Sequence, residues 1–218
     1  MADDTALKRA RVKIKVVGIG GGGNSVLLRM AKSDFIHAQN IEDIELIAIN
    51  TDAKQLATLD DMGITCLQIG AAITHGRGTG GNLEVGEQAA KADEARIKEA
   101  LSGADLVFVT AGMGAGTGTG VVPVVSQIAK ELGVLTIGVV TLPFAFEGTR
   151  KKRLAEAGVL KMQGYMDALL AIHNDNLMKL PENRKITLVQ AFKLADSVLE
   201  QAIRCIAELI LKTGVINV

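Results

Sequence analysis

Residues 12–24 read VKIKVVGIGGGGN, a short apolar run followed by a cluster of glycines. The run at Val12–Val17 predicts a buried strand, and a helical pattern follows over Asn24–Lys32. Glycines between a strand and a helix let a phosphate approach the backbone closely, where the first N–H groups of the helix are free to bind it. This stretch therefore predicts an α/β protein that binds a phosphorylated ligand.

The same alternation of strand and helix continues along the chain. Apolar runs predict further strands at Ile44–Ile49, Cys66–Ile69, Asp105–Val109, Val134–Val140 and Ala168–Ile172. Helical patterns cover Glu84–Leu101, Gly118–Leu132 and Thr149–Gln163. Strands that alternate with helices of this length form right-handed crossovers. We therefore expect a three-layer, Rossmann-like α/β fold with a doubly wound, mostly parallel sheet.

The amino-acid composition indicates a folded globular protein and disfavours nucleic-acid-binding, membrane-spanning and metal-binding classes. Of the 218 residues, 48% are hydrophobic, which predicts a folded core. Basic and acidic residues number 24 each, so no charge excess indicates nucleic-acid binding. The most apolar stretch, Val134–Leu142, is too short to cross a bilayer, and we expect a cytoplasmic protein without direct membrane insertion. The cysteines and histidines show no metal-binding spacing, so we expect no metal site built by the protein alone.

Two more glycine clusters follow the first, HGRGTGGN at 75–82 and AGMGAGTGTG at 111–120. Three such loops favour a polyphosphate ligand, with the hydroxyls of Thr117 and Thr119 as added donors and Mg²⁺ neutralising the charge. The sequence contains no GxxxxGK[ST], which excludes a P-loop.

An NAD-dependent oxidoreductase is the first alternative, because GxGxxG is also the dinucleotide fingerprint. That fold needs an acidic residue about 20 positions further on, at the end of the second strand. Here the spacing reaches Asp43 and Glu45, where the strand begins, and the strand ends in Asn50-Thr51-Asp52. NAD binding is therefore disfavoured.

The segment Thr187–Lys212 predicts a long helix with a narrow polar stripe and apolar residues over most of its remaining surface. A helix of this kind usually has protein packed against more than one of its sides. We therefore expect a second domain or a partner to cover it.

The stretch Gly114–Gly120 resembles the signature of the tubulin/FtsZ family of GTPases. The similarity runs from Lys13 to Val218, and further matching segments occur in the family's order: the first glycine loop through Asn24, Asn50-Thr51-Asp52-Ala53, the second glycine loop, Pro143–Gly148, Asn174-Asp175, Gln190-Ala191-Phe192 with Asp196, and Gly214–Asn217. The resemblance implies a filament-forming cell-division GTPase at the division site, which binds GTP or GDP with Mg²⁺.

The resemblance also implies roles for individual residues. The phosphates would be held by Gly20, Gly21, Gly22, Gly23, Gly114, Ala115, Gly116, Thr117, Gly118 and Thr119, with Asn50 and Asp52 near the γ-phosphate. Glu147 and Lys151 would bind the ribose. The guanine would be bound by Asn24, Asn174, Phe192 and Asp196, since a carboxylate accepts from the guanine N1–H and N2–H₂ groups, which adenine lacks.

The sequence departs from the family pattern at several positions. Thr79 and Gly81 replace alanines, Leu83 replaces a proline, Ala115 replaces a glycine, Lys151 stands where an arginine is expected, and His173 replaces a proline. The methyl group of Ala115 is tolerated only if that residue has a negative φ. Lys151 keeps the positive charge of arginine but loses its bidentate fork.

The resemblance implies a flexible N-terminus at 1–11, a GTP-binding domain at 12–185, a long central helix at 186–213 and the start of a catalytic loop at 214–218. In this family a loop of the next subunit supplies an aspartate that activates the attacking water. In this chain Asn217 would begin that loop, and the aspartate would follow Val218. We therefore expect that no catalytic set is complete, that the C-terminal activation domain is absent, and that the chain binds nucleotide but hydrolyses and polymerises poorly.

We also expect self-association, by head-to-tail filaments in the full-length protein or by exchange of the long helix between copies of this chain. A non-catalytic, tubulin-like capping or scaffold protein is the second alternative.

Overall fold

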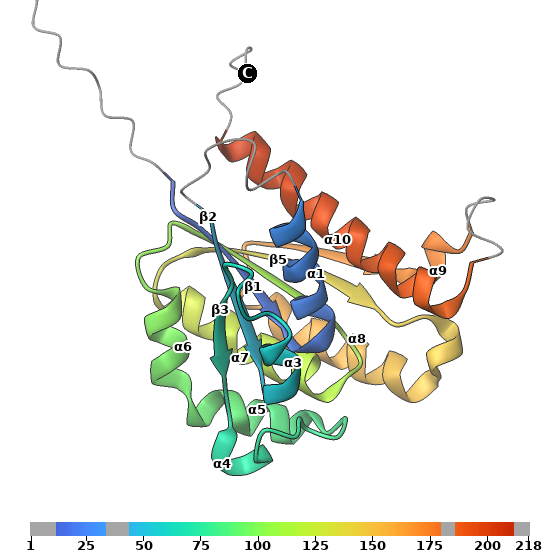
Figure 1. The fold of residues 1–218 in the computed structure, drawn as a ribbon, viewed down its shortest axis with the longest axis horizontal. Helices are drawn as coiled ribbons and strands as arrows, with labels where there is room; N and C mark the ends of the chain where they lie inside the picture. The colour runs from blue at the N-terminus through green and yellow to red at the C-terminus, as the bar shows by residue number, and fades with distance from the viewer. Residues whose placement is uncertain (1–11, 34–43, 180–185, 212–218) are drawn as a thin grey trace, which may run out of the picture.

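The computed structural model describes residues 12–33, 44–179 and 186–211 (Figure 1). Its strands are β1 (Ile14–Ile19), β2 (Ile44–Asn50), β3 (Thr65–Gln68), β4 (Leu106–Gly112), β5 (Leu135–Leu142) and β6 (Ala168–His173). They form a six-stranded sheet in the order β3-β2-β1-β4-β5-β6, and every neighbouring pair runs parallel. The predicted doubly wound parallel sheet is confirmed.

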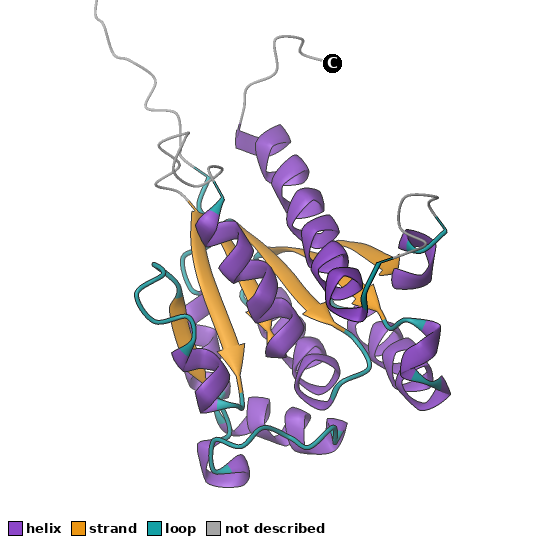
Figure 2. Ribbon diagram, turned by 45° about the vertical axis from the view of Figure 1, so that its right-hand side comes forward, coloured by secondary structure: helices purple, strands orange, loops and turns teal. Residues whose placement is uncertain are grey.

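Helices cover both faces of this sheet (Figure 2). They are α1 (Gly20–Lys32), α3 (Ala53–Ala57), α4 (Ala71–Thr74), α5 (Leu83–Ala92), α6 (Glu94–Leu101), α7 (Gly116–Glu131), α8 (Thr149–Gln163), α9 (Asn174–Leu177) and α10 (Leu188–Leu211), with a 3₁₀ turn, η1, at Ala145–Glu147. One core contains residues of α1 and α10, and the other contains residues of α5, α6, α7 and α8.

The strands are apolar along their length because both faces are buried. Val16 and Phe108 point into the core beneath α1 and α10, whereas their neighbours Val17 and Val109 point into the opposite core. All four side chains are fully buried. This burial explains why the strands read as continuous apolar runs and do not alternate between apolar and polar residues.

The carboxyl ends of β1 and β4 lie side by side at the centre of the sheet, where the strand order reverses. Ligands of open α/β sheets bind at such a switch point, beyond the carboxyl ends of the strands. β1 leads directly into α1 at Gly20, and β4 leads through a short turn into α7 at Gly116. Two helix N-termini therefore meet at this edge.

Several boundaries differ from the sequence prediction. α1 and α7 begin earlier than expected, so glycines form their first turns. The expected helix Glu84–Leu101 is two helices, because Asp93 leaves the helical conformation and its carboxylate accepts a hydrogen bond from the Gly70 N–H at 2.6 Å. The short helices α3, α4 and α9 were not predicted. The expected flexible segment 1–11, Lys212 at the end of the predicted helix, and the segment 214–218 lie outside the described residues.

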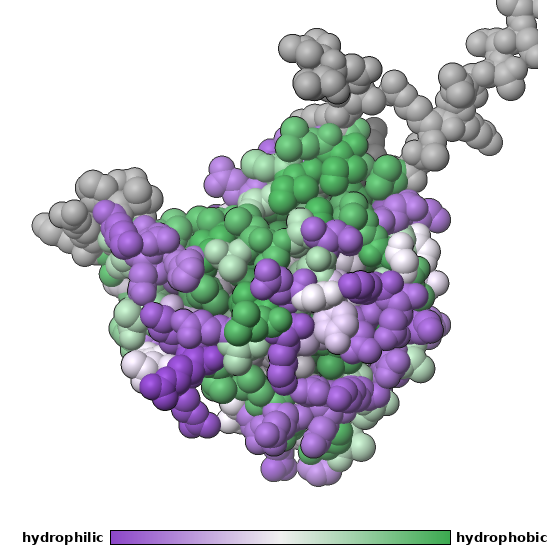
Figure 3. All heavy atoms as spheres, turned by 180° about the vertical axis from the view of Figure 1, so that it is seen from behind, coloured by the Kyte–Doolittle hydropathy of each residue, from purple (hydrophilic) through white to green (hydrophobic). Residues whose placement is uncertain are grey.

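Helix α10 buries one stripe of residues and leaves much of its apolar surface exposed. Ala191, Ala195, Leu199, Ile203 and Ala207 are buried at successive turns. The exposed large apolar side chains on α10 are those of Leu188, Val189, Phe192, Leu209 and Ile210. Seen from behind, the molecule gathers apolar residues in its upper half and polar residues in its lower half (Figure 3). No helix in the described residues is long and apolar enough to span a membrane.

Candidate functional site

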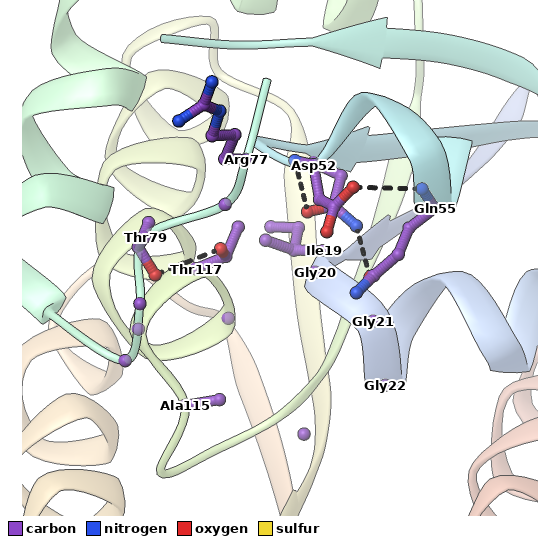
Figure 4. Close-up of a pocket in the computed structure, with 17 residues that line it drawn as sticks. Ile19, Gly20, Gly21, Gly22, Asp52, Gln55, Arg77, Thr79, Ala115 and Thr117 are labelled. Carbon is purple, nitrogen blue, oxygen red and sulfur yellow. Dashed lines mark hydrogen bonds between the residues drawn. The ribbon is translucent and has the colours of Figure 1, made fainter. Parts of the chain in front are cut away.

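A cavity of about 330 Å³ lies where the first and third glycine loops meet, and we call it the phosphate cavity (Figure 4). Its lining comes from the start of α1, the end of β2, the second glycine loop and the start of α7: Ile19, Gly20, Gly21, Gly22, Asn50, Asp52, Gln55, Arg77, Gly78, Thr79, Gly80, Gly81, Gly112, Ala115, Gly116, Thr117 and Gly118. Many of these residues are glycines, and the first turns of two helices, whose N–H groups have no partner within the helix, lie among them.

Glycine is required here for close approach and for unusual backbone angles. A Cβ on Gly22 would lie 3.0 Å from the backbone nitrogen of Gly112, so a side chain would push the first and third loops apart. Gly114 has φ of 97°, a conformation that L side chains rarely adopt. Ala115, which follows it, has φ of −102°, so the negative φ that its methyl group requires is confirmed.

Three amide side chains tie the first glycine loop to the end of β2. The Asn50 amide group donates to Oδ1 of Asn24 at 2.7 Å and to Oε1 of Gln55 at 3.0 Å. Asn24 in turn donates to the carbonyl oxygen of Gly18 at 2.9 Å. Asn50 and Asn24 are both buried. This network holds the backbone on one side of the cavity in place.

Asp52 is the acidic side chain in the phosphate cavity lining. Its Oδ1 atom caps α3 by accepting hydrogen bonds from the N–H groups of Lys54 and Gln55, at 2.9 and 3.2 Å. Its Oδ2 atom faces the second glycine loop, where it lies 3.8 Å from the position that a Cβ on Gly78 would occupy. One carboxylate oxygen is therefore engaged by the helix, and the other is directed toward the loop.

A second cavity of about 300 Å³ continues from the first, and we call it the base cavity. Its lining is Gly21, Gly22, Ser25, Gly112, Met113, Ala115, Thr141, Pro143, Glu147, Lys151, Asn174, Phe192, Ala195 and Asp196. Gly21, Gly22, Gly112 and Ala115 also line the phosphate cavity, so the two cavities adjoin.

Asn174 and Asp196 place two polar groups in the base cavity. Asn174 at the start of α9 is 4% exposed, and its Oδ1 atom has no hydrogen-bond partner among the described residues. Burial raises the pKa of the Asp196 carboxyl to about 6, and the nearby charge of Arg29 opposes this rise. A buried carbonyl oxygen without a donor and an ionised carboxylate in a desolvated site both destabilise the fold unless a ligand forms hydrogen bonds with them.

Glu147 and Phe192 line the base cavity, and Phe144 and Phe146 pack against Phe192. The Glu147 carboxylate accepts hydrogen bonds from the Phe144 N–H at 2.9 Å and from Nζ of Lys151 at 3.0 Å. Phe192 stands edge-on to Phe144, with ring centroids 5.6 Å apart, and it is 43% exposed. Phe146 stacks on Phe144 with centroids 4.8 Å apart.

The two cavities bring together most of the residues that the sequence predicts for a nucleotide site. Gly23, Gly114 and Thr119 line neither cavity, and the Thr119 hydroxyl accepts a hydrogen bond from the Gly114 N–H at 2.7 Å. Asn24 lines neither cavity, because its amide group is engaged by Gly18 and Asn50. Its role toward guanine stays a prediction.

Sequence reasoning assigned no role to Gln55, Arg77 or Thr79, which also line the phosphate cavity. Arg77 and Thr79 belong to the second glycine cluster, so their place in that cluster was the available signal. The Arg77 side chain extends away from Gly20 and Thr117 (Figure 4). Gln55 had no comparable signal, because the short helix α3 is not visible in the sequence pattern.

Comparison with known proteins places this architecture in a family. Residues 13–182, more than half of the chain, match the model of the tubulin/FtsZ family GTPase domain. The chain is 47% identical over 205 residues to the cell division protein FtsZ of Buchnera aphidicola subsp. Acyrthosiphon pisum, covering 94% of this chain and 51% of that protein. It is also 47% identical over 206 residues to the FtsZ of Aquifex aeolicus, covering 94% of this chain and 54% of the relative.

The solved structures agree with this result. A structure titled as an empty FtsZ dimer of M. jannaschii matches with a TM-score of 0.85 and 42% identity, covering 97% of this chain and 59% of that chain. CetZ2 of Haloferax volcanii shares the fold, with a TM-score of 0.73 at 24% identity over 92% of this chain and 58% of that chain. The chain spans about half the length of the curated relatives that it matches. With its parallel sheet and its three converging glycine loops, the chain belongs to the tubulin/FtsZ family and carries the family's GTPase domain.

Proposed function

We propose that the chain binds a guanine nucleotide, with the phosphates in the phosphate cavity and the base in the base cavity. The observation that carries this proposal is the overlap of the two cavities. Gly21, Gly22, Gly112 and Ala115 line both, so one elongated ligand can extend from the glycine loops to α10. A nucleoside polyphosphate has this form, with an anionic end and a planar, polar-edged end.

The phosphate end of the ligand is bound mainly by backbone. The N-termini of α1 and α7 supply free N–H groups and the positive ends of two helix dipoles. Asn50, Asp52 and the second glycine loop line the phosphate cavity but not the base cavity, so they lie at the end away from the base. We assign the terminal phosphate of the nucleotide to that end.

The base end would select guanine through Asp196 and Asn174. The ionised Asp196 carboxylate accepts hydrogen bonds from N1–H and N2–H₂ of guanine, two donors on an edge that adenine does not present in this form. The unpartnered Oδ1 atom of Asn174 gives the site another acceptor. Phe192 would pack against the base, and the Glu147 carboxylate, which Lys151 positions, would accept from ribose hydroxyls.

Mg²⁺ would accompany the triphosphate. Magnesium takes one or two protein carboxylates together with phosphate oxygens and waters, and the Oδ2 atom of Asp52 suits this role at the terminal-phosphate end. The cation would neutralise charge on the phosphates. Asp52 is the only acidic residue among the described residues that line the phosphate cavity, and its Oδ1 atom caps α3. These residues therefore offer no second carboxylate to act as a general base there. We therefore expect the 218-residue chain to bind GTP and to hydrolyse it at a rate near background.

We further propose a role in the filaments of cell division. The curated relatives are named cell division proteins, and one related structure is titled as a dimer. The exposed apolar side chains Leu188, Val189 and Leu209 on α10 favour self-association of this chain. Sedimentation velocity over a range of concentrations measures this directly, and a strictly monomeric species at high concentration would contradict it.

The binding proposal is tested by purifying the protein, releasing any bound small molecule by denaturation and identifying it by chromatography. We expect GDP or GTP. Thermal shift with GDP and with NADH gives the second measurement, because a nucleotide that binds the folded state raises the melting temperature. We expect stabilisation by GDP alone. Stabilisation by NADH without any by GDP would overturn the proposal.

A further inference from the structure

Three threonine hydroxyls from separate segments meet beside the phosphate cavity. Thr51 follows β2, Thr79 belongs to the second glycine loop, and Thr117 lies in the first turn of α7. Oγ1 of Thr117 lies 2.8 Å from Oγ1 of Thr51 and 3.5 Å from Oγ1 of Thr79. A dashed line joins the Thr79 and Thr117 hydroxyls in Figure 4.

The buried end of this chain of hydroxyls determines where the protons go. Thr51 is fully buried and does not line the cavity, and Thr117 is the partner of its hydroxyl among the described residues. A buried hydroxyl donates where it can, so the Thr51 proton goes to Thr117. Each hydroxyl has one proton and can accept two hydrogen bonds. Thr117 and Thr79 therefore have one proton to share between them and one to donate into the cavity.

The longer contact leaves the Thr79 hydroxyl only weakly held. At 3.5 Å the bond between Thr79 and Thr117 is weak, because good O–H···O bonds are 2.5–3.0 Å long. A phosphoryl oxygen carries negative charge and is a stronger acceptor than a hydroxyl. The Thr79 proton would therefore turn to such an oxygen at little cost.

The second glycine loop holds Thr79 in position. The Gly78 N–H donates to the Thr51 carbonyl oxygen at 3.3 Å, and the backbone of Arg77 forms an isolated antiparallel β-bridge with the backbone of Asp52. On the other side, the Asn82 N–H donates to the carbonyl oxygen of Thr79 at 3.1 Å. Both flanks of the residue are therefore fixed, so its hydroxyl stays at the end of the cavity to which the terminal phosphate is assigned.

We propose that Thr79 is a specificity residue that distinguishes the triphosphate from the diphosphate by donating a hydrogen bond to the terminal phosphate. This inference rests on the proposed function, because it assumes that a guanine nucleotide occupies the two cavities. It goes beyond that function by assigning the discrimination to one side chain, at a position where the family pattern has an alanine without a hydroxyl.

The test measures the affinities of the 218-residue protein for GDP and for guanosine 5′-(β,γ-imido)triphosphate, both with Mg²⁺, by isothermal titration calorimetry. Thr79→Val removes the hydroxyl and keeps the shape of the side chain. We expect its affinity for the triphosphate analogue to fall about tenfold, the worth of one hydrogen bond to a charged group, while its affinity for GDP is unchanged. Thr79→Ser should restore the triphosphate affinity. Thr65 is an exposed residue at the amino end of β3, opposite the carboxyl ends of the strands where the glycine loops lie. Thr65→Val is therefore the matched control and should change neither affinity.

Each outcome bears on the proposal. An equal loss for both nucleotides in Thr79→Val would show that the side chain only supports the loop, and no loss for either would show that it makes no contact; either result overturns the inference. If the unsubstituted protein binds neither nucleotide, the proposed function itself fails. If circular dichroism shows that Thr79→Val is unfolded, Thr79→Ala replaces it, with the same expected selective loss.

Discussion

The two ends of the proposed site are built from different parts of the chain. The phosphate cavity is lined mainly by glycines and by the first turns of α1 and α7. The base cavity is lined by side chains from η1, α8, α9 and α10, among them Glu147, Asn174 and Asp196. In the proposed site, the phosphate charge would be bound by backbone groups, whereas the identity of the base would be read by particular side chains.

This difference predicts two kinds of mutational sensitivity. At the phosphate end, adding a side chain should lower the nucleotide affinity because it blocks the ligand or separates the loops. At the base end, removing a polar group does harm because it removes a specific partner. The predictions below, ordered by expected effect, test this division.

The largest effect is expected for Gly22→Val. A Cβ at this position meets the backbone of Gly112 at 3.0 Å, and Gly22 lines both cavities. We expect the affinity for GDP to fall at least about 100-fold, a loss of about 2.7 kcal/mol. Calorimetry measures the affinity, and Gly164→Ala, at an open position at the end of α8, is the control. Unchanged GDP binding would mean that the backbone of this loop does not form the phosphate site.

A smaller effect, with a different signature, is expected for Asp196→Asn. The amide presents an N–H₂ group where the carboxylate accepted from guanine, so we expect GDP affinity to fall about 30-fold. Binding of ADP should change much less, and the ratio of the two affinities is the measurement. Glu200 lies one turn along α10 from Asp196 and forms an ion pair with Arg29 outside the base cavity. Glu200→Gln is therefore the matched control. Equal losses for GDP and ADP would remove Asp196 from base recognition.

The raised pKa of Asp196, about 6, predicts two opposite trends with pH. In the proposed complex guanine binds the ionised carboxylate, so GDP affinity should fall about tenfold between pH 7 and pH 5. In the protein without nucleotide, the folded state holds this proton more tightly than the unfolded state. The stability from Asp196 is therefore present below about pH 4 and is lost as the pH rises through about 6.

Asp196→Asn should abolish both trends. At pH 7 it should raise the free energy of unfolding by an amount on the order of 1 kcal/mol, after allowance for the partial exposure of the carboxyl. Calorimetry and urea unfolding at several pH values measure the two quantities. A GDP affinity that is flat from pH 7 to pH 5 would show that the carboxylate does not contact the base.

The smallest effect is expected for Lys151→Arg. Lys151 donates to Glu147 at 3.0 Å on an exposed part of the wall, and arginine would add a second donor in a planar fork. We expect GDP affinity to rise about twofold to threefold, since exposed ion pairs contribute little. Lys152→Arg, on the next residue of α8 and outside both cavities, is the control. A loss of affinity would show that the lysine geometry is specifically required.

The sequence predicted the phosphate end better than the base end, for a physical reason. Glycine clusters after apolar runs are local signals, so Gly20 and Gly116 could be placed from spacing alone. The base cavity gathers Glu147, Asn174 and Asp196 from three distant segments, and only the family resemblance joined them. Gln55 was missed because α3 is too short to show a periodic pattern, and the break at Asp93 was missed because it depends on a contact with Gly70.

Nucleotide selectivity of the unsubstituted protein tests the central claim most directly. Calorimetric titration with GDP, inosine diphosphate and ADP varies the base and keeps the diphosphate constant. We expect GDP to bind most tightly, inosine diphosphate about tenfold more weakly because it lacks the N2–H₂ donor, and ADP about 100-fold more weakly or worse. Equal affinity for all three would contradict the claim, because it would leave a phosphate site without a base site.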